Sequence, residues 1–118
     1  MSKPDVKVDI LTAVYGHPDL FKQCADTLLD PERDPGVSFH WWIIDDYGPQ
    51  EPGLVAIYAK LRTDPRCTVI MSKKNRGFAG ANNEAARYGK APFILLLNSD
   101  TRTRHPNWLK MMVSEFTN

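Results

Sequence analysis

The sequence predicts an α/β fold with a mostly parallel sheet of about four strands and helices on both faces. Four short runs rich in apolar and β-branched residues alternate with four segments whose apolar residues recur at helical spacing. Each segment between consecutive strands is long enough for a helix, and such crossovers join parallel strands. A length of 118 residues allows one domain, residues 1–118, and no second one.

The first strand and helix are expected at the beginning of the chain. Residues 6–10 alternate between apolar and charged side chains and 11–14 are nearly all apolar, which indicates a strand entering a buried sheet. Pro18 suits the first turn of a helix. The apolar stripe of this helix is Leu20, Phe21, Cys24, Ala25, Leu28 and Leu29. Asp-Pro pairs between 30 and 36 then indicate a loop.

The middle of the chain repeats this pattern. Aromatic and β-branched residues at 39–44 predict a second strand, and a helical stripe follows over 54–61. A short third strand is expected at 68–71. The Ala-rich stretch 78–88 favours a third helix, and Gly89 is a natural stop for it.

The last strand and helix complete the βαβαβαβα order. Residues 93–97 are apolar without alternation, so we expect a strand buried on both faces at the centre of the sheet. Pro106 is expected to open the final helix. Its apolar stripe would be Trp108, Leu109, Met112, Val113 and Phe116.

Composition and missing motifs exclude several functions. A net charge of +1 argues against a nucleic-acid partner. The longest apolar run, 93–97, is far too short to span a bilayer. Cys24 and Cys67 lack the spacing of a metal or redox motif and are expected as buried, reduced thiols in a cytoplasmic protein. A glycine-rich dinucleotide fingerprint and a P-loop are both absent from the sequence.

Polar residues follow all four predicted strands, where open parallel sheets bind their ligands. These ends are residues 12–15, 45–46, 73–77 and 98–100. Without a glycine-rich cradle, a bound diphosphate needs a divalent cation on a carboxylate, and Asp100 is the obvious ligand. Asp45 or Asp46 could accept hydrogen bonds from a base or a ribose hydroxyl.

Four motifs in these strands and loops match a known family in order. They are Val-Asp-Ile-Leu-Thr-Ala-Val-Tyr at 8–15, Ile-Ile-Asp-Asp-Tyr-Gly at 43–48, Asn-Arg-Gly-Phe-Ala-Gly-Ala-Asn-Asn at 75–83 and Leu-Leu-Leu-Asn-Ser-Asp-Thr at 95–101. The chain resembles the nucleotide-binding half of the family 2 glycosyltransferases, which have the GT-A fold with a Rossmann-like N-terminal half. The last motif looks most like the rhamnosyltransferase-like branch.

This resemblance implies inverting transfer of a sugar from a UDP-, TDP- or GDP-sugar to a saccharide or glycan acceptor, with Mg²⁺ or Mn²⁺ as cofactor. It implies that Thr12 and Tyr15 border the base and that Asp45, or its neighbour Asp46, contacts base and ribose. Asp100 would be the metal-binding end of the family's Asp-x-Asp motif. The other positions implied at the nucleotide are Asn75, Arg76, Gly77 and Asn98.

The chain departs from the family pattern in two ways. Asn98 replaces the first Asp of Asp-x-Asp, so one carboxylate remains for the metal, and its affinity should fall unless donor phosphates complete the shell. The family's catalytic base lies beyond the matched region. Asp19 and Glu115 are expected to be helix caps or solvated side chains and Glu84 matches no base of the family, so none of the three takes this role. We therefore expect an apparently truncated domain that binds a nucleotide sugar weakly and transfers little or nothing by itself.

Two other classes of function compete with this interpretation. A phosphoacceptor signalling domain also places acidic residues at strand ends, but it needs carboxylates after the first strand, where 12–15 has none. A non-catalytic nucleotide-binding or interaction module on the same scaffold is the alternative, because loss of the acceptor half would leave such a domain. An apolar sheet edge exposed by truncation would also favour self-association.

Overall fold

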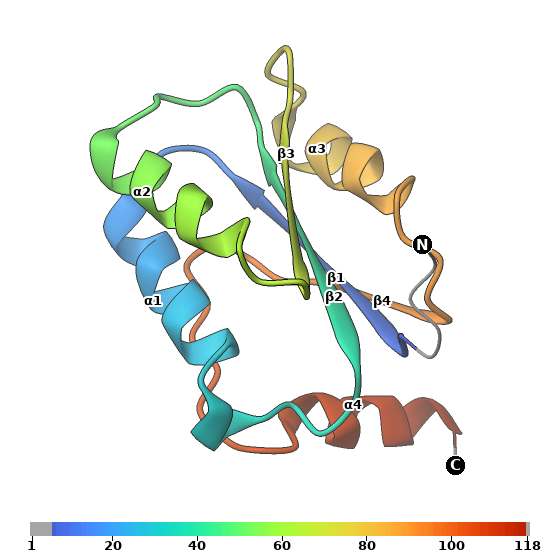
Figure 1. Cartoon of the computed structure of the whole chain (residues 1–118). Coiled ribbons are helices and arrows are strands. Elements are labelled where there is room, and N and C mark those ends of the chain that lie inside the picture. Colours follow the sequence, from blue (N-terminus) through green and yellow to red (C-terminus); the bar gives the residue numbers. More distant parts are fainter. Residues whose placement is uncertain (1–5, 118) are drawn as a thin grey trace.

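A computed structural model describes residues 6–117 of the chain; residues 1–5 and 118 of the expected 1–118 domain lie outside the described part (Figure 1). The elements follow in the order β1 (Val8–Val14), α1 (Pro18–Leu28), the short 3-10 helix η1 (Pro31–Arg33), β2 (Phe39–Asp45), α2 (Pro52–Leu61), β3 (Cys67–Met71), α3 (Gly77–Ala86), β4 (Phe93–Leu96) and α4 (Trp108–Thr117). The predicted alternation of strands and helices is therefore confirmed.

All strand pairs of the four-stranded sheet are parallel, in the order β3-β2-β1-β4. Residues of α1, α2 and α4 share one core cluster with the sheet, whereas α3 packs on the opposite face with Leu11 and Ile44. Figure 1 shows this arrangement, with α1 and α2 on one side of the strands and α3 on the other. The predicted α/β architecture with helices on both faces is correct.

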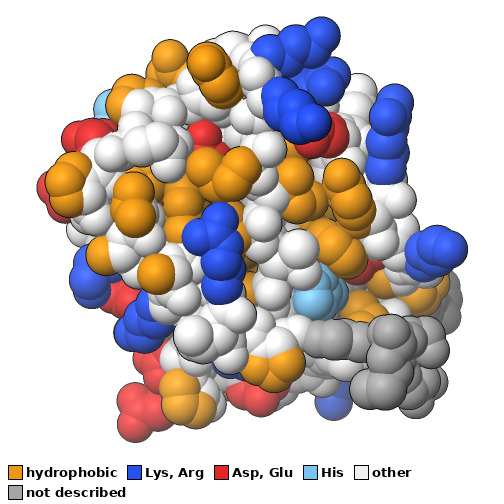
Figure 2. All heavy atoms as spheres, turned by 45° about the horizontal axis from the view of Figure 1, so that its top comes forward, with side chains coloured by type: hydrophobic (Ala, Val, Ile, Leu, Met, Phe, Trp, Pro, Cys, Tyr) orange, Lys and Arg blue, Asp and Glu red, His pale blue; other side chains and the backbone are white. Residues whose placement is uncertain are grey.

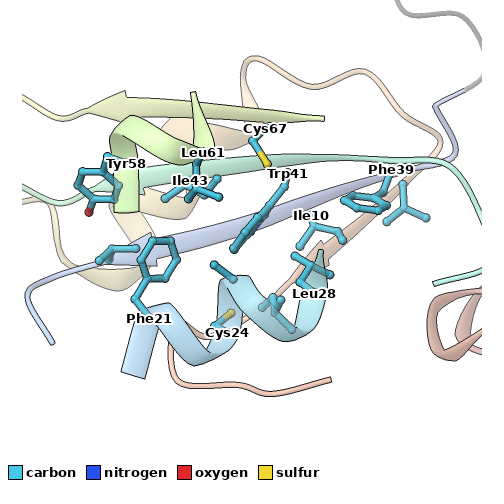
Figure 3. Packing of buried hydrophobic residues seen from close by; sticks show 14 of the residues in the cluster. Ile10, Phe21, Cys24, Leu28, Phe39, Trp41, Ile43, Tyr58, Leu61 and Cys67 are labelled. Atoms are coloured by element: carbon cyan, nitrogen blue, oxygen red, sulfur yellow. The ribbon is translucent and has the colours of Figure 1, made fainter. Parts of the chain in front are cut away.

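The larger core cluster is built around aromatic rings from three elements. Trp41 of β2 is fully buried and points toward α1, where its ring centroid lies 5.7 Å from that of Phe21 (Figure 3). Tyr58 of α2 packs edge-on against the same phenylalanine at 6.0 Å. Because neighbours in a strand face opposite sides, Trp42 lies on the α3 face and stacks on Tyr88. Aromatic contacts on both faces of the sheet therefore help to hold the helices against the strands.

The expectation of a central fourth strand is wrong. In the described part of the chain β4 pairs with β1 alone and forms an edge of the sheet. Ile94 and Leu96 are 57% and 53% exposed, because α3 packs over β1 and β2 and leaves this face of β4 uncovered. The apolar run therefore reflects a strand with one open face.

The final helix is shorter than expected, and one side of its stripe is exposed. It begins at Trp108, two residues after Pro106. Leu109 and Val113 are buried against the core, but Met112 and Phe116 are 43% and 78% exposed. The helix lies at one end of the sheet (Figure 1), and of its predicted stripe Leu109 and Val113 join the core, with Trp108 packed partly against it.

Cys24 and Cys67 are both buried, as expected. Among the described residues, every helix is too short or too polar to cross a lipid bilayer.

Candidate functional site

The carboxyl ends of the strands bring the predicted site segments to one edge of the sheet. Asp46 donates its backbone N–H to the Val14 carbonyl at 2.8 Å, which joins the loop after β2 to the end of β1. The Ser72 N–H donates to the Asp45 carbonyl at 3.0 Å. The Leu97 N–H donates to the Leu11 carbonyl at 2.8 Å, so the loop after β4 also begins at this edge.

Asp45 ends β2 with a completely buried carboxylate that faces α2. Its Oδ2 accepts hydrogen bonds from the Tyr58 hydroxyl at 2.6 Å and from Gln50 Nε2 at 3.3 Å. Its Oδ1 accepts one from the Gly48 N–H at 2.9 Å. Burial, followed by this hydrogen bond and the Asp45 charge, raises the pKa of Tyr58 far above its usual value. The carboxylate thus stabilises the loop after β2.

Asp46, the next residue, lies on the other face of the sheet. It is 5% exposed, and its Oδ1 accepts a 2.7 Å hydrogen bond from the backbone N–H of Arg76. This contact links the loop after β2 to the loop before α3. Two of the four sequence motifs therefore meet at a single carboxylate.

The loop before α3 has its own internal hydrogen bonds. Ser72 Oγ donates to the Lys74 carbonyl at 2.8 Å, and Asn75 Oδ1 accepts from the Gly77 N–H at 3.0 Å. Gly77 has φ +74° and open space where a side chain would begin, so its backbone conformation, and not crowding, requires glycine. Lys73 is exposed beside Lys74, and Figure 2 shows Lys and Arg side chains grouped near the upper edge of this view.

Thr12 and Tyr15 occupy contrasting positions at the end of β1. The Thr12 side chain is completely buried, and its hydroxyl accepts a 2.9 Å hydrogen bond from the Trp41 indole. Tyr15 is 53% exposed and lies against Gly48, where an added Cβ would come within 3.2 Å of its ring. A shallow hollow of about 620 Å³ lies between the loops after β1 and β2, with Tyr15 in its wall.

The loop after β4 presents the predicted metal ligand. Asn98 and Asp100 are exposed, while the Thr101 N–H donates to the Asn98 carbonyl at 3.1 Å. The Cys24 thiol also approaches that carbonyl, at 3.8 Å. Burial, and then the nearby Asp100 charge, raises the pKa of Cys24 to about 12.

The acidic residues do not form a complete metal cage. Within residues 6–117, no three His, Cys, Asp or Glu side chains are grouped so that they could hold a metal ion. Asp100 can supply one carboxylate oxygen and Asn98 one amide oxygen, which are ligands that hard divalent cations accept. These residues fit a metal that is also held by the oxygens of a bound diphosphate.

Two side chains that contact candidate site residues are not indicated by the sequence patterns: Tyr58, which contacts Asp45, and Glu84, which contacts Arg76. The helical pattern over 54–61 places Tyr58 in an apolar stripe and does not indicate its contact with Asp45. The one signal for that contact is the hydroxyl, since a buried phenol needs a polar partner. Glu84 was considered only as a catalytic base. In the structure Glu84 Oε1 lies 2.7 Å from Arg76 Nε and 3.3 Å from Ser72 Oγ.

Comparison with known sequences decides the family. The sequence profile described as Glycosyl transferase family 2 matches residues 9–118, which include all four strands. The chain belongs to glycosyl transferase family 2. The resemblance inferred from the four motifs is thereby confirmed, and the chain is a glycosyltransferase domain.

Relatives of this glycosyltransferase domain are much longer than the chain. The O-antigen biosynthesis protein RfbC of Myxococcus xanthus is 28% identical over 109 residues, which are 92% of this chain and 8% of RfbC. A crystal structure of residues 1–349 of S. aureus TarS in complex with UDP superposes with a TM-score of 0.72 at 19% identity, covering 94% of this chain and 32% of that TarS chain. The chain therefore spans less than a third of TarS and less than a tenth of RfbC.

A third relative was solved with both a nucleotide sugar and a metal. The mannosyltransferase PcManGT from Pyrobaculum calidifontis, in complex with GDP-Man and Mn²⁺, superposes with a TM-score of 0.64 at 22% identity, over 81% of this chain and 28% of PcManGT. At these identities the likeness concerns the fold. It confirms that the parallel sheet and its helices are those of the GT-A glycosyltransferases.

Proposed function

We propose that this family 2 domain binds a nucleotide-diphosphate sugar at the carboxyl edge of its sheet, as the donor half of an inverting glycosyltransferase. The Asp46–Arg76 hydrogen bond carries the proposal, because it brings two of the family motifs together at that edge. The complexes of TarS with UDP and UDP-GlcNAc, and of PcManGT with GDP-Man, support this class of ligand.

The nucleoside is proposed to lie between the loops after β1 and β2. Tyr15 offers an exposed ring beside the hollow there, and rings of this kind stack on bases. Asp46 lies at the junction with the loop before α3 and is the better placed of the two aspartates to meet base or ribose. Thr12 and Asp45 are completely buried and engaged with the core, so they support these loops from below.

The diphosphate is proposed to lie between Asp100 and the loop before α3, where Asn75, Arg76 and Gly77 follow one another. Asp100, assisted by Asn98, would hold Mg²⁺ or Mn²⁺ together with the phosphate oxygens. The bound cation would neutralise the charge that develops on the leaving diphosphate. Arg76 adds a cationic side chain, 41% exposed, to the same region.

Transfer to a saccharide or glycan acceptor needs a base that the described residues do not offer. Glu84 is paired with Arg76, and Asp19 and Glu115 are exposed side chains on α1 and α4. We propose that the chain alone binds the donor without appreciable turnover. The alternative, a non-catalytic nucleotide-binding module, would show the same binding, and addition of acceptor distinguishes them only in the whole protein.

Two further proposals concern the cellular compartment of the domain and its self-association. Two buried cysteines without the spacing of a metal or redox motif fit a reducing compartment such as the cytoplasm. The open edge and exposed face of β4 support association of the chain with itself.

Calorimetric titration of the purified chain with UDP, TDP and GDP, with and without Mn²⁺, tests the proposed function. We expect at least one diphosphate to bind, and to bind more tightly with Mn²⁺. The Asp100→Ala variant should lose the metal dependence and keep the fold, as judged by circular dichroism. Absence of binding by any of the three nucleotides, with a folded chain, would refute the proposal.

A further inference from the structure

Glu84 is a half-buried carboxylate on α3 that the proposed chemistry does not use. Its Oε1 forms an ion pair with Arg76, 2.7 Å from Nε, and also lies 3.3 Å from Ser72 Oγ. Its side chain is 20% exposed, half as exposed as that of Arg76. Glu84 therefore joins the end of β3 to the loop that begins α3.

Arg76 is fixed through its backbone N–H and its Nε, whereas its terminal guanidinium nitrogens are available to a ligand. Its backbone N–H is bonded to Asp46, and its Nε is paired with Glu84. Within residues 6–117, its two terminal nitrogens have no hydrogen-bond partner. An arginine fixed through Nε keeps its planar fork in one orientation, and that fork can bind two phosphate oxygens at once.

The aliphatic part of the Arg76 side chain lies against Gly80, which has no side chain of its own. A Cβ atom added to Gly80 would lie only 2.8 Å from Arg76 Cβ. The absence of that atom lets the arginine side chain lie along the first turn of α3 toward Glu84. The sequence thus provides both the space for the stem and the carboxylate that fixes its end.

We propose that Glu84, together with the space at Gly80, positions Arg76 so that its terminal nitrogens bind the diphosphate of the donor. The inference rests on the proposed function and adds a positioning residue to it. Lys73 and Lys74 in the same loop are exposed cations without such a support, so they attract the diphosphate but do not orient it.

The test compares UDP with uridine, which lacks the diphosphate. Both ligands are titrated into the unsubstituted chain and into Glu84→Ala, Glu84→Gln, Arg76→Ala and the double variant, with Mn²⁺ present. We expect Glu84→Ala to weaken UDP binding about fivefold, the upper range for an ion pair at this exposure, and to leave uridine binding unchanged. Glu84→Gln should retain part of the affinity, because its amide oxygen can still lie beside Nε although the charge of the ion pair is lost.

The double variant separates positioning from a general structural role. If Glu84 acts through Arg76, Glu84→Ala should weaken UDP binding no further when Arg76 is already alanine. Lys73→Ala is the matched control for loss of a cation; its smaller effect should disappear at high salt. Circular dichroism checks that each variant is folded.

Three results would overturn the inference. Equal losses for UDP and uridine would show that Glu84 only maintains the fold. A full effect of Glu84→Ala in the Arg76→Ala background would show that it does not act through Arg76. Unchanged UDP binding by Glu84→Ala would show that the carboxylate does not position Arg76, and tighter binding would show that it repels the ligand. If the unsubstituted chain fails to bind UDP, the proposed function fails together with the inference.

Discussion

The Tyr58 hydroxyl donates a 2.6 Å hydrogen bond to Oδ2 of Asp45, and both residues are completely or almost completely buried. The contact joins the middle of α2 to the last residue of β2. No Lys, Arg or His within residues 6–117 forms a salt bridge with Asp45, so neutral donors satisfy this buried charge. The position of the loop after β2 depends on them.

Tyr58→Phe should destabilise the chain by about 1–3 kcal/mol, because a buried carboxylate loses a hydrogen bond while keeping its charge. Urea unfolding followed by tryptophan fluorescence measures the change. Tyr47→Phe is the matched control, since Tyr47 is 64% exposed in the same region and its substitution should change stability by less than about 0.5 kcal/mol. A similar small effect for Tyr58→Phe would contradict the assignment.

Stability should decline in alkaline solution because two buried acids resist ionisation. The pKa of Cys24 rises from 9.0 to about 12 on folding, and that of Tyr58 rises well above its usual 10.0. Both groups are neutral in either state below about pH 9; above it the unfolded chain loses protons that the folded chain retains. The free energy of unfolding should therefore fall progressively from about pH 9 to about pH 12.

Urea unfolding at a series of pH values, under reducing conditions, measures this slope. Cys24→Ser removes one of the groups whose pKa rises on folding, at little change in size, so its slope should be shallower. Cys67→Ser serves as a control for general loss of a buried thiol. If the free energy of unfolding falls equally steeply with pH for Cys24→Ser and the unsubstituted chain, the Cys24 thiol ionises equally in the folded and unfolded states.

Metal binding should require the nucleotide. Asp100 is the one carboxylate in the loop after β4, and an isolated carboxylate with an amide binds a hard cation weakly. Mn²⁺ titrated alone should give little heat, whereas Mn²⁺ with UDP should bind measurably. Asp100→Asn should abolish that difference, and Glu115→Gln, on exposed α4, should preserve it. Tight binding of Mn²⁺ without UDP would indicate a cage that the structure does not contain.

The open edge of β4 should make the chain self-associate at high concentration. Ile94 and Leu96 expose apolar surface beside a strand edge that lacks charge. Sedimentation velocity over a range of concentrations should detect the association, and Leu96→Lys should abolish it. Val55→Lys, on the exposed face of α2, is the control and should leave association unchanged. A concentration-independent monomer would refute the prediction.

Much of the architecture could be predicted because each local pattern has one physical explanation. Helical stripes separated by short apolar runs leave few alternatives to a parallel sheet, and the carboxyl ends of parallel strands share one edge. For that reason Asp46, Arg76 and Asp100 could be assigned to the same edge before their contacts were known. Asp45 and Asp46 are adjacent and chemically identical, however. Only the pairing of β2 with its neighbours decides that Asp45 faces the core and Asp46 faces the loop before α3.

The sequence by itself determined the order of elements, the family and the segments that meet at the candidate site, because these depend on local periodicity and on motifs. The tertiary structure decided the edge position of β4, the burial of Thr12 and the pairing of Arg76 with Glu84. These depend on which surfaces meet. An apolar run has the same sequence pattern whether one or both faces of its strand are covered. The sequence likewise does not distinguish a carboxylate that contacts water from one that contacts a phenol or a guanidinium.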